Sequence, residues 1–221
     1  MEVYFQVITD AETLKEACEK LSQFDSLGFD TETTALDPFE GNIRLVQLSN
    51  GAETKVIDLK PFREKGDLRT LPELASLRDI LANPKIEKIA HNAKFDAKWV
   101  KHHLGVDVGG MFDTLLASQL IAAGDQDRRH SLAEVVSFFL GQELDKSQQV
   151  SDWSAAELSH SQVEYAARDA ATMLPLREKV WEKLKTDELD KTAKLEFDCV
   201  MSVAAMEQNG FYLDRGRWLE Q

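Results

Sequence analysis

The chain has 221 residues, of which 26 are Lys or Arg and 39 are Asp or Glu, so its formal net charge at pH 7 is −13. A hydrophobic share of 43%, with only 11 Gly and 5 Pro, argues against a disordered or collagen-like chain. The length predicts one large domain, or one domain plus part of another, with enough chain to bury a core. The negative charge argues against a protein that coats nucleic acid without specificity, although it is compatible with a local basic channel.

The sequence shows no signal for a membrane or for export. No apolar run approaches the roughly 18 residues of a membrane span, and the N-terminus has no basic residue before Lys15 and no apolar signal core. We therefore expect a cytoplasmic protein with no membrane partner and no targeting segment. Cys18 and Cys199 lie far apart in sequence without a metal-binding spacing, so we expect two buried, reduced thiols.

The first half of the chain alternates strands with helices. A short strand is predicted over residues 4–8, and the capping-box spacing of Thr9 and Glu12 predicts a helix after it. Asn50 and Gly51 are a favoured hairpin pair, so the strands that flank them should be antiparallel neighbours. The other predicted strands of this half cover residues 27–32, 43–48, 55–59 and 86–90.

The second half is predicted to be mostly helical. Pro175 predicts a kink or break in the longest helix, and Asn209 with Gly210 is a good helix stop. A hairpin meander that is then crossed and flanked by helices predicts an α/β sandwich around a mixed central sheet. The expected helices, including one in the first half, cover residues 72–81, 94–104, 112–122, 131–140, 161–184 and 192–208.

Asp30 and Glu32 are the most informative residues of the predicted strands. They are separated by one residue, so on a strand they point to the same face. Two like charges side by side near a core repel each other and lose hydration. The alternative is that they lie beyond the strand end, in a turn that Thr31, Thr33 and Thr34 would suit. This segment alone leaves both interpretations open.

Two further pairs of polar residues follow in chain order. Asn92 and Asp96 lie four residues apart at a predicted helix start, where Asn92 could simply cap the helix. Tyr165 and Asp169 share one face of a later helix. Each pair alone is common, but four carboxylates that converge require cations. Mg²⁺ and Mn²⁺ prefer oxygen ligands, and two such ions about 3.5–4 Å apart can stabilise both the attacking and the leaving oxygen of phosphodiester hydrolysis.

This ordered set of motifs resembles the DEDD superfamily of 3′–5′ exonucleases, in the branch with Tyr rather than His in its last motif. The resemblance covers roughly residues 5–185 and implies a ribonuclease H-like fold with two divalent cations, Mg²⁺ or Mn²⁺. It further implies that Tyr165 positions the attacking hydroxide, because a phenol with a pKa near 10 is a poor general base at neutral pH. The matches are Phe29-Asp30-Thr31-Glu32-Thr33, Asn92 with Phe95-Asp96, and Tyr165 with Asp169. The implied catalytic residues are Asp30, Glu32, Asp96, Tyr165 and Asp169, and the four carboxylates are the implied metal ligands.

Several other residues are candidates for contact with the substrate strand. Residues 83–103 carry a local net charge of +3, which fits either a phosphate track or a solvated helix face. The resemblance implies that Leu36 wedges against the terminal base. Arg129 fits a backbone contact or a solvated helix start, and Trp153 fits base stacking or a packed anchor. The expected nucleic-acid-binding residues are Leu36, His91, Asn92, Lys94, Phe95, Arg129 and Trp153.

The main prediction is a metal-dependent 3′–5′ exonuclease that releases nucleoside monophosphates from a single-stranded or frayed 3′ end of DNA. Residues 1–190 would form the exonuclease domain, while 191–221 resemble the start of a family A DNA polymerase domain, so a proofreading role is favoured. One alternative is a ribonuclease D-like enzyme with RNA as substrate. A second is a catalytically silent nucleic-acid-binding module, against which the presence of all four carboxylates argues.

Overall fold

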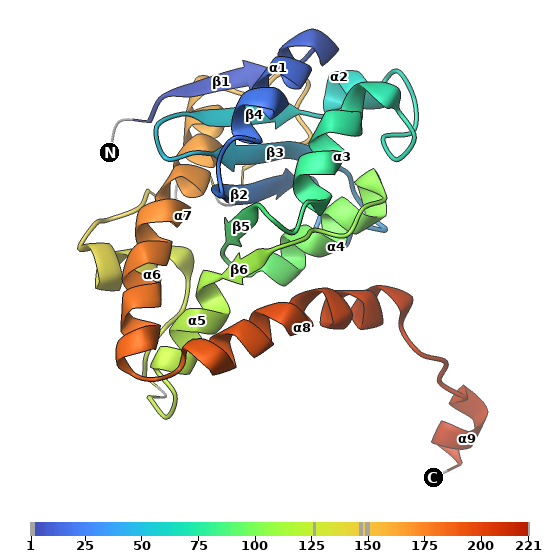
Figure 1. Cartoon of the computed structure of the whole chain (residues 1–221). Helices are drawn as coiled ribbons and strands as arrows, with labels where there is room; N and C mark the ends of the chain where they lie inside the picture. The colour runs from blue at the N-terminus through green and yellow to red at the C-terminus, as the bar shows by residue number, and fades with distance from the viewer. Residues whose placement is uncertain (1–2, 126, 146–147, 149–150, 221) are drawn as a thin grey trace.

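A six-stranded mixed sheet forms the centre of the computed structural model, which describes residues 3–125, 127–145, 148 and 151–220 (Figure 1). The strands are β1 (Phe5–Ile8), β2 (Ser26–Thr33), β3 (Ile43–Ser49), β4 (Thr54–Asp58), β5 (Glu87–Ala90) and β6 (Met111–Asp113). Their order is β1-β4-β3-β2-β5-β6. β2, β3 and β4 form an antiparallel meander, and β1, β5 and β6 join it in parallel. The predicted mixed sheet and its hairpin are confirmed.

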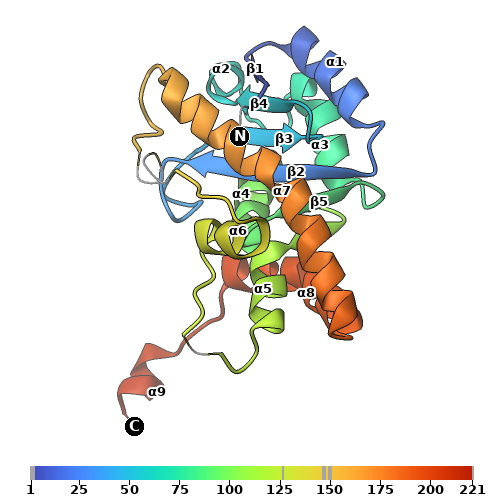
Figure 2. The same ribbon diagram turned by 90° about the vertical axis from the view of Figure 1, so that its left-hand side faces the viewer.

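Helices cover both faces of this sheet. The face that carries Leu27 and Phe29 packs against α1, α3 and α4 in one large apolar core, which includes Leu14, Leu77 and Trp99. α7 crosses the opposite face (Figure 2). The helices are α1 (Ala11–Leu21), α2 (Lys60–Arg63), η1 (Pro72–Leu74), α3 (Ala75–Ala82), α4 (Ala93–Leu104), α5 (Thr114–Ile121), α6 (Leu132–Leu140), α7 (His160–Thr186), α8 (Asp190–Asn209) and α9 (Arg215–Leu219).

The predicted break at Pro175 is wrong, because α7 runs without interruption from residue 160 to 186. Met173, Leu176 and Val180, on either side of the proline, are all buried in one cluster with α5 and α6. This burial holds the helical path even though the proline removes one backbone hydrogen bond. The consequence is one continuous helix that carries its N-terminal residues over the sheet.

Three smaller predictions about local structure are also wrong. The helix expected over 112–122 begins at Thr114, because the residues before it form β6 and pair in parallel with β5. Such pairing is non-local, so a three-residue strand leaves little pattern in the sequence. Asp10, rather than Thr9, caps α1 by accepting from the Thr13 backbone N–H. Cys199 is exposed, although Cys18 is buried as expected.

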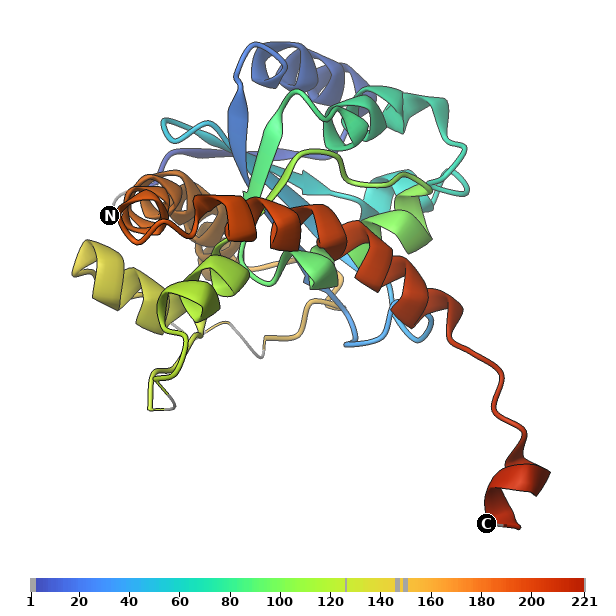
Figure 3. The same ribbon diagram turned by 60° about the horizontal axis from the view of Figure 1, so that its bottom comes forward.

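The C-terminal part of the chain has two sections. α8 runs beneath the sheet and packs on α4 and α5, with Phe197 and Val200 buried in the two apolar clusters (Figure 3). It ends at Asn209 with Gly210 as its C-cap, as the sequence predicts. The residues after Gly210, including α9, extend away from the body (Figures 1 and 3). Among the described residues, no helix is both long enough and apolar enough to cross a bilayer.

Candidate active site

The C-terminal end of β2 supplies the first two site residues. Asp30 and Glu32 share the face of β2 that α7 covers, as their spacing predicts. α7 lies directly on this strand at Gly28, where an added Cβ would stand 2.0 Å from the Ala170 carbonyl oxygen. Glycine within a strand permits such a close approach of another backbone. Gly28 therefore brings α7 close to the two carboxylates.

Two helices, α7 and α4, supply the remaining residues of the acidic cluster. α7 contributes Tyr165 and Asp169, and the first turn of α4 contributes Asp96. The Thr31 hydroxyl donates a 2.7 Å hydrogen bond to Asp96 Oδ1. Thr31 therefore lies within the strand and joins β2 to α4, rather than forming a turn. The alternative of two solvated acids beyond the strand end is wrong, because β2 continues to Thr33.

All five predicted catalytic residues line one open cavity of about 550 Å³. This cavity lies at the carboxyl ends of the parallel strands β2 and β5, which is where open α/β sheets commonly bind ligands. Its wall also contains Leu36, Asn92, Phe95 and Trp153. The full lining is Asp30, Thr31, Glu32, Thr33, Thr34, Ala35, Leu36, His91, Asn92, Phe95, Asp96, Ser151, Trp153, Tyr165 and Asp169.

The pKa values of all four carboxylates are raised above their ordinary range. Burial is the largest cause for each of them, and repulsion from neighbouring acids adds to it at Asp30 and Glu32, whose pKa values lie well above the ordinary range. Burial raises the pKa of Asp96 and of Asp169 to about 7, against hydrogen bonds from Thr31 and Tyr165 that lower them. The folded chain thus holds several acids that resist ionisation at neutral pH.

A divalent cation fits this donor set. Within the described residues, no Lys or Arg forms a salt bridge with any of the four carboxylates. In the described part of the chain, no group of three or more His, Cys, Asp or Glu side chains is arranged so that it could already hold a metal ion, so the fit rests on the chemistry of the donors. An open, oxygen-rich and uncompensated site suits Mg²⁺ or Mn²⁺, which keep free coordination positions for water and phosphate.

Asp113 is a positioning residue that the sequence analysis missed. Its carboxylate accepts from the backbone N–H groups of Asn92 and Ala93 at 3.1 and 2.9 Å, and from Leu115 and Leu116 at 2.8 and 3.3 Å. One buried side chain therefore caps both α4 and α5. Asn92 itself makes no side-chain cap and adopts a left-handed conformation, so simple helix capping by Asn92 is wrong. Its amide is left exposed on the cavity wall.

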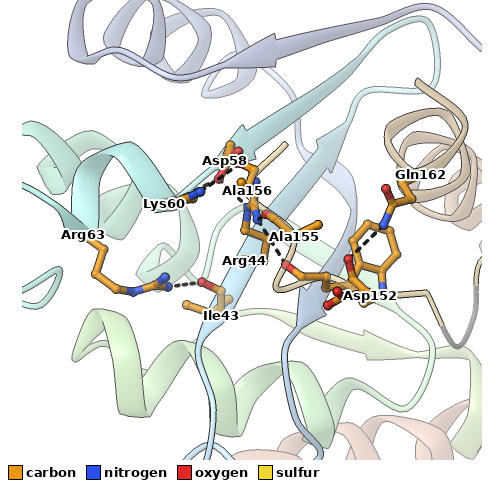
Figure 4. A network of polar contacts seen from close by, with 10 residues as sticks. Ile43, Arg44, Asp58, Lys60, Arg63, Asp152, Ala155, Ala156 and Gln162 are labelled. Atoms are coloured by element: carbon orange, nitrogen blue, oxygen red, sulfur yellow. Dashed lines mark hydrogen bonds and ion pairs between the residues drawn. The ribbon is translucent and has the colours of Figure 1, made fainter. Parts of the chain in front are cut away.

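A second polar network holds the loop that carries Trp153 (Figure 4). Arg44 on β3 forms a two-point ion pair with Asp58 and also donates to the carbonyl oxygens of Trp153 and Ala155. Trp153 is 5% exposed and still lines the cavity, so it is the packed anchor of the loop as well as part of the site. Residues 146, 147, 149 and 150, in the polar segment before it, lie outside the described residues.

None of the lysines of residues 83–103 lines this cavity, so a phosphate track there, which the sequence leaves open beside a solvated helix face, stays a prediction. Lys94 and Lys98 both pair with Glu207 of α8, at 2.6 and 2.9 Å. Lys101 pairs with Asp107, and Lys88 is buried with its ammonium on two backbone carbonyls. Lys94 and Lys98 thus fasten α4 to α8, and Lys101 fastens the end of α4 to the loop after it.

His91 and Arg129 differ in their relation to the cavity. His91 lines it, but both ring nitrogens already bond within the protein, to Thr114 Oγ1 and to the His130 carbonyl oxygen, each at 2.9 Å. Burial lowers the pKa of His91 to about 4, so its ring is neutral at pH 7. Arg129 is exposed and is not part of the cavity wall. Contacts of either residue with nucleic acid stay predictions.

Residues 5–185 match a family described as 3′–5′ exonuclease. The chain belongs to this family. The predicted ribonuclease H-like fold and the predicted exonuclease activity are thereby confirmed. A divalent metal is the general cofactor of such exonucleases. The silent-module alternative is not favoured, since the family is one of active nucleases.

Individual relatives fall into two groups. DNA polymerase I of Aquifex aeolicus is 36% identical over 230 residues, covering 95% of the chain and 36% of the polymerase. Ribonuclease D of Zymomonas mobilis is 30% identical over 173 residues, covering 77% of the chain and 42% of that enzyme. The chain thus spans less than half the length of either relative.

A solved structure with a bound metal is also similar. NrnC of Brucella melitensis with bound Mg²⁺ has a TM-score of 0.77 and 27% identity, with 95% of each chain covered. The same protein has been solved bound to pGG, with the same TM-score and coverage.

Proposed function

We propose that this chain hydrolyses DNA from its 3′ end and releases nucleoside monophosphates, as the proofreading exonuclease of a family A DNA polymerase. The observation that carries the proposal is the convergence of four uncompensated carboxylates and Tyr165 on one open cavity. These residues come from three separate elements, β2, α4 and α7. Pocket acids with strongly raised pKa values are typical of sites that do chemistry.

Asp30, Glu32, Asp96 and Asp169 would hold two divalent cations, Mg²⁺ or Mn²⁺. Bound cations of this kind lower the pKa of water and stabilise charge on the attacking and leaving oxygens. Four acids with two cations are charge-balanced, which offsets the repulsion that raises the carboxylate pKa values. The open side of the cavity leaves room for the scissile phosphate.

Tyr165 orients the attacking water. Burial, followed by repulsion from Asp169 and a hydrogen bond to that carboxylate, raises the pKa of the phenol above its ordinary value of 10. The phenol therefore stays protonated at neutral pH and cannot act as the general base. A protonated hydroxyl that is held in place still fixes the direction of attack.

The cavity rim provides apolar surfaces for the terminal nucleotide. Leu36 is 87% exposed and lies at the mouth of the cavity, where it can wedge against a base. Phe95 and Trp153 line the same cavity and can pack on sugar or base. The exposed amide of Asn92 can bond a sugar hydroxyl or a phosphate. Such contacts do not read sequence, which suits an enzyme that removes any 3′-terminal nucleotide.

The extent of similarity favours DNA over RNA. The match to Aquifex polymerase I covers 95% of the chain and so extends along α8, whereas the match to ribonuclease D covers 77%. We further propose that residues 191–221 lead into a polymerase domain in the full-length protein. The exposed side chains of Phe211, Tyr212 and Trp218 support this, because such apolar groups suit a buried junction. Immunoblotting of the native protein tests this continuation by its mass.

A ribonuclease D-like activity on RNA is the second candidate. It is favoured by the 30% identity to ribonuclease D and by the similarity over 95% of both chains to NrnC, which has been solved with pGG. In this case α8 would close a self-contained domain that acts on RNA ends or very short oligonucleotides. Both candidates use the same cavity, so they differ in substrate and not in chemistry.

A gel assay separates these candidates. Wild type and Asp30→Ala are incubated with matched DNA and RNA primers that carry a 3′ mismatch, and with pGG, in Mg²⁺, Mn²⁺ or EDTA. We expect metal-dependent shortening of DNA from the 3′ end, absent in EDTA and in the variant. Faster trimming of RNA or of pGG would replace the proofreading proposal with the second candidate. No shortening of any substrate in either metal would contradict both.

A further inference from the structure

Gln47, in the middle of β3, is a buried amide without a visible partner. Its side chain is 0% exposed, and neither Nε2 nor Oε1 has a hydrogen bond within the described residues. A buried amide that stays unpaired costs free energy, and most buried polar groups in proteins are therefore paired. An apolar side chain of similar volume would pack here without that cost. The amide thus points to a partner that it meets in another state of the site.

The sheet register places Gln47 beside Asp30. The two residues are direct cross-strand partners on β3 and β2, so their side chains share one face. Cβ atoms of such partners lie about 4.5–5.5 Å apart, within reach of a glutamine amide. On its other side Gln47 pairs with Val56 of β4. Asp30 is therefore the acidic neighbour across the strand pair.

The other groups around Gln47 offer few hydrogen-bond partners. Leu45 and Val56 of this face belong to an apolar cluster with Ala166 and Ala167 of α7. Two nearby polar side chains, Ser49 and Thr54, already have partners. The Ser49 hydroxyl accepts from the Gly51 N–H at 3.2 Å, and the Thr54 hydroxyl donates to the Ala167 carbonyl oxygen at 3.2 Å. The Asp30 carboxylate is the adjacent group on β2 that a free N–H donor could serve.

We propose that Gln47 is a positioning residue for Asp30. Its Nε2 donates a hydrogen bond to the Asp30 carboxylate when that carboxylate holds a divalent cation, and so fixes which way the carboxylate faces. Partners that hydrogen-bond a metal-ligating side chain from behind commonly raise metal affinity by 10- to 100-fold. This inference rests on the proposed role of Asp30 as a metal ligand.

Calorimetric titration of the DNA-free protein with Mn²⁺ tests the inference without using catalysis. Gln47→Met removes the donor and the acceptor but keeps the length of the side chain. We expect Mn²⁺ to bind about 10-fold more weakly to this variant. We also expect a thermal midpoint in EDTA no lower than that of wild type, because an unpaired amide has been removed. Should Gln47→Met fail to fold, Gln47→Leu takes its place with the same expectation.

Two further variants make the outcome decisive. Thr54→Val removes another buried polar group from the same face, so it should lower the thermal midpoint and leave Mn²⁺ affinity unchanged. Asp30→Asn should abolish most Mn²⁺ binding. Wild-type affinity in Gln47→Met, with loss in Asp30→Asn, would overturn the role of Gln47 and leave the proposed metal site standing. Wild-type affinity in Asp30→Asn would overturn both.

Discussion

Two polar clusters near the same end of the sheet differ in whether their buried charges are paired with opposite charges. In the first, Arg44 is almost fully buried and forms a two-point ion pair with Asp58, with its remaining donors on backbone carbonyl oxygens (Figure 4). In the second, Asp30 and Glu32 face Asp96 and Asp169 without a paired Lys or Arg among the described residues. The charges of the first cluster neutralise each other, whereas the second cluster holds negative charges only.

The difference separates a structural role from a chemical one. A buried ion pair whose charges are matched is electrically complete, and its hydrogen bonds fasten the 151–158 loop to the sheet. A cluster of like charges destabilises the folded chain, so its presence points to a ligand that neutralises it. Breaking each cluster should therefore change different properties. Loss of the balanced one lowers stability, whereas loss of the other removes activity.

The largest expected effect is on activity, in Asp30→Asn. We expect DNA hydrolysis to fall by about 10³-fold or more, which corresponds to about 4 kcal/mol on the barrier, because a metal ligand is replaced by a neutral group. The free energy of unfolding in EDTA should stay the same or rise, since one member of a repelling cluster is removed. A primer-shortening assay and urea denaturation measure the two. Activity within a few-fold of wild type would contradict the site assignment.

The next effect is on stability, in Arg44→Met. Removing one partner of a buried ion pair leaves Asp58 uncompensated and should cost about 3–5 kcal/mol of unfolding free energy in urea denaturation. Lys60→Met is the matched control, because Lys60 donates to the Ala156 carbonyl oxygen of the same loop from a more exposed position. The control should lose about 1 kcal/mol or less. Equal losses in the two variants would show that burial of the Arg44 pair is not what holds the loop.

Tyr165→Phe should affect turnover more than binding. We expect kcat to fall by about 10²-fold, because the hydroxyl that orients the attacking water is lost. The Kd for single-stranded DNA, measured by fluorescence anisotropy, should change by no more than a few-fold. Tyr4→Phe is the control, because Tyr4 is an exposed tyrosine just before β1, and it should change neither kcat nor Kd. An unchanged kcat in Tyr165→Phe would remove the residue from the mechanism.

The smallest expected effect is on the pH dependence of stability, in Asp169→Asn. The pKa of Asp169 is about 7 in the folded chain, above its unfolded value near 4, so the folded state binds the extra proton between these values. This contribution to stability is therefore present at low pH and is lost as pH rises toward 7. The free energy of unfolding of the wild type should therefore fall as pH rises between about 4 and 7. In EDTA, Asp169→Asn should make this fall shallower by up to about 1.4 kcal/mol per pH unit.

Thermal unfolding at pH 5 and pH 8 measures this difference between Asp169→Asn and wild type. The comparison cancels other titrating groups, such as His91, whose lowered pKa acts in the opposite direction at acid pH. Mg²⁺ should stabilise the wild type more at pH 8 than at pH 5, because cations bind the ionised carboxylates. Parallel pH profiles of wild type and variant in EDTA would contradict the raised pKa of Asp169.

The residues that meet in the cavity were predictable because their signals are local. Asp30 and Glu32 lie two apart on a strand, and Tyr165 and Asp169 lie four apart on a helix, so each pair shares a face whatever the rest of the chain does. Such patterns can be read from spacing alone. Their order along the chain then resembles a known family, and the family match confirms that resemblance.

The basic stretch over residues 83–103 shows a property that neighbouring residues in sequence do not predict, namely which lysines are free to bind a ligand. Residues 83–103 have a positive net charge, but the free charge of a lysine depends on what packs beside it. Glu207 lies more than 100 residues away in sequence and pairs with both Lys94 and Lys98. Lys88 is buried with its ammonium on the carbonyl oxygens of Ile80 and Asn83. No feature of the stretch itself predicts these partners.

The sequence alone determined the proposed catalytic set, since the type and the spacing of Asp30, Glu32, Asp96, Tyr165 and Asp169 are covalent facts of the chain. Tertiary structure decided how these residues meet. Gly28 lets α7 lie against β2, and the Asp113 carboxylate caps the helix that carries Asp96. These features depend on contacts between segments far apart in sequence, which form only when burial of the apolar core brings the segments together.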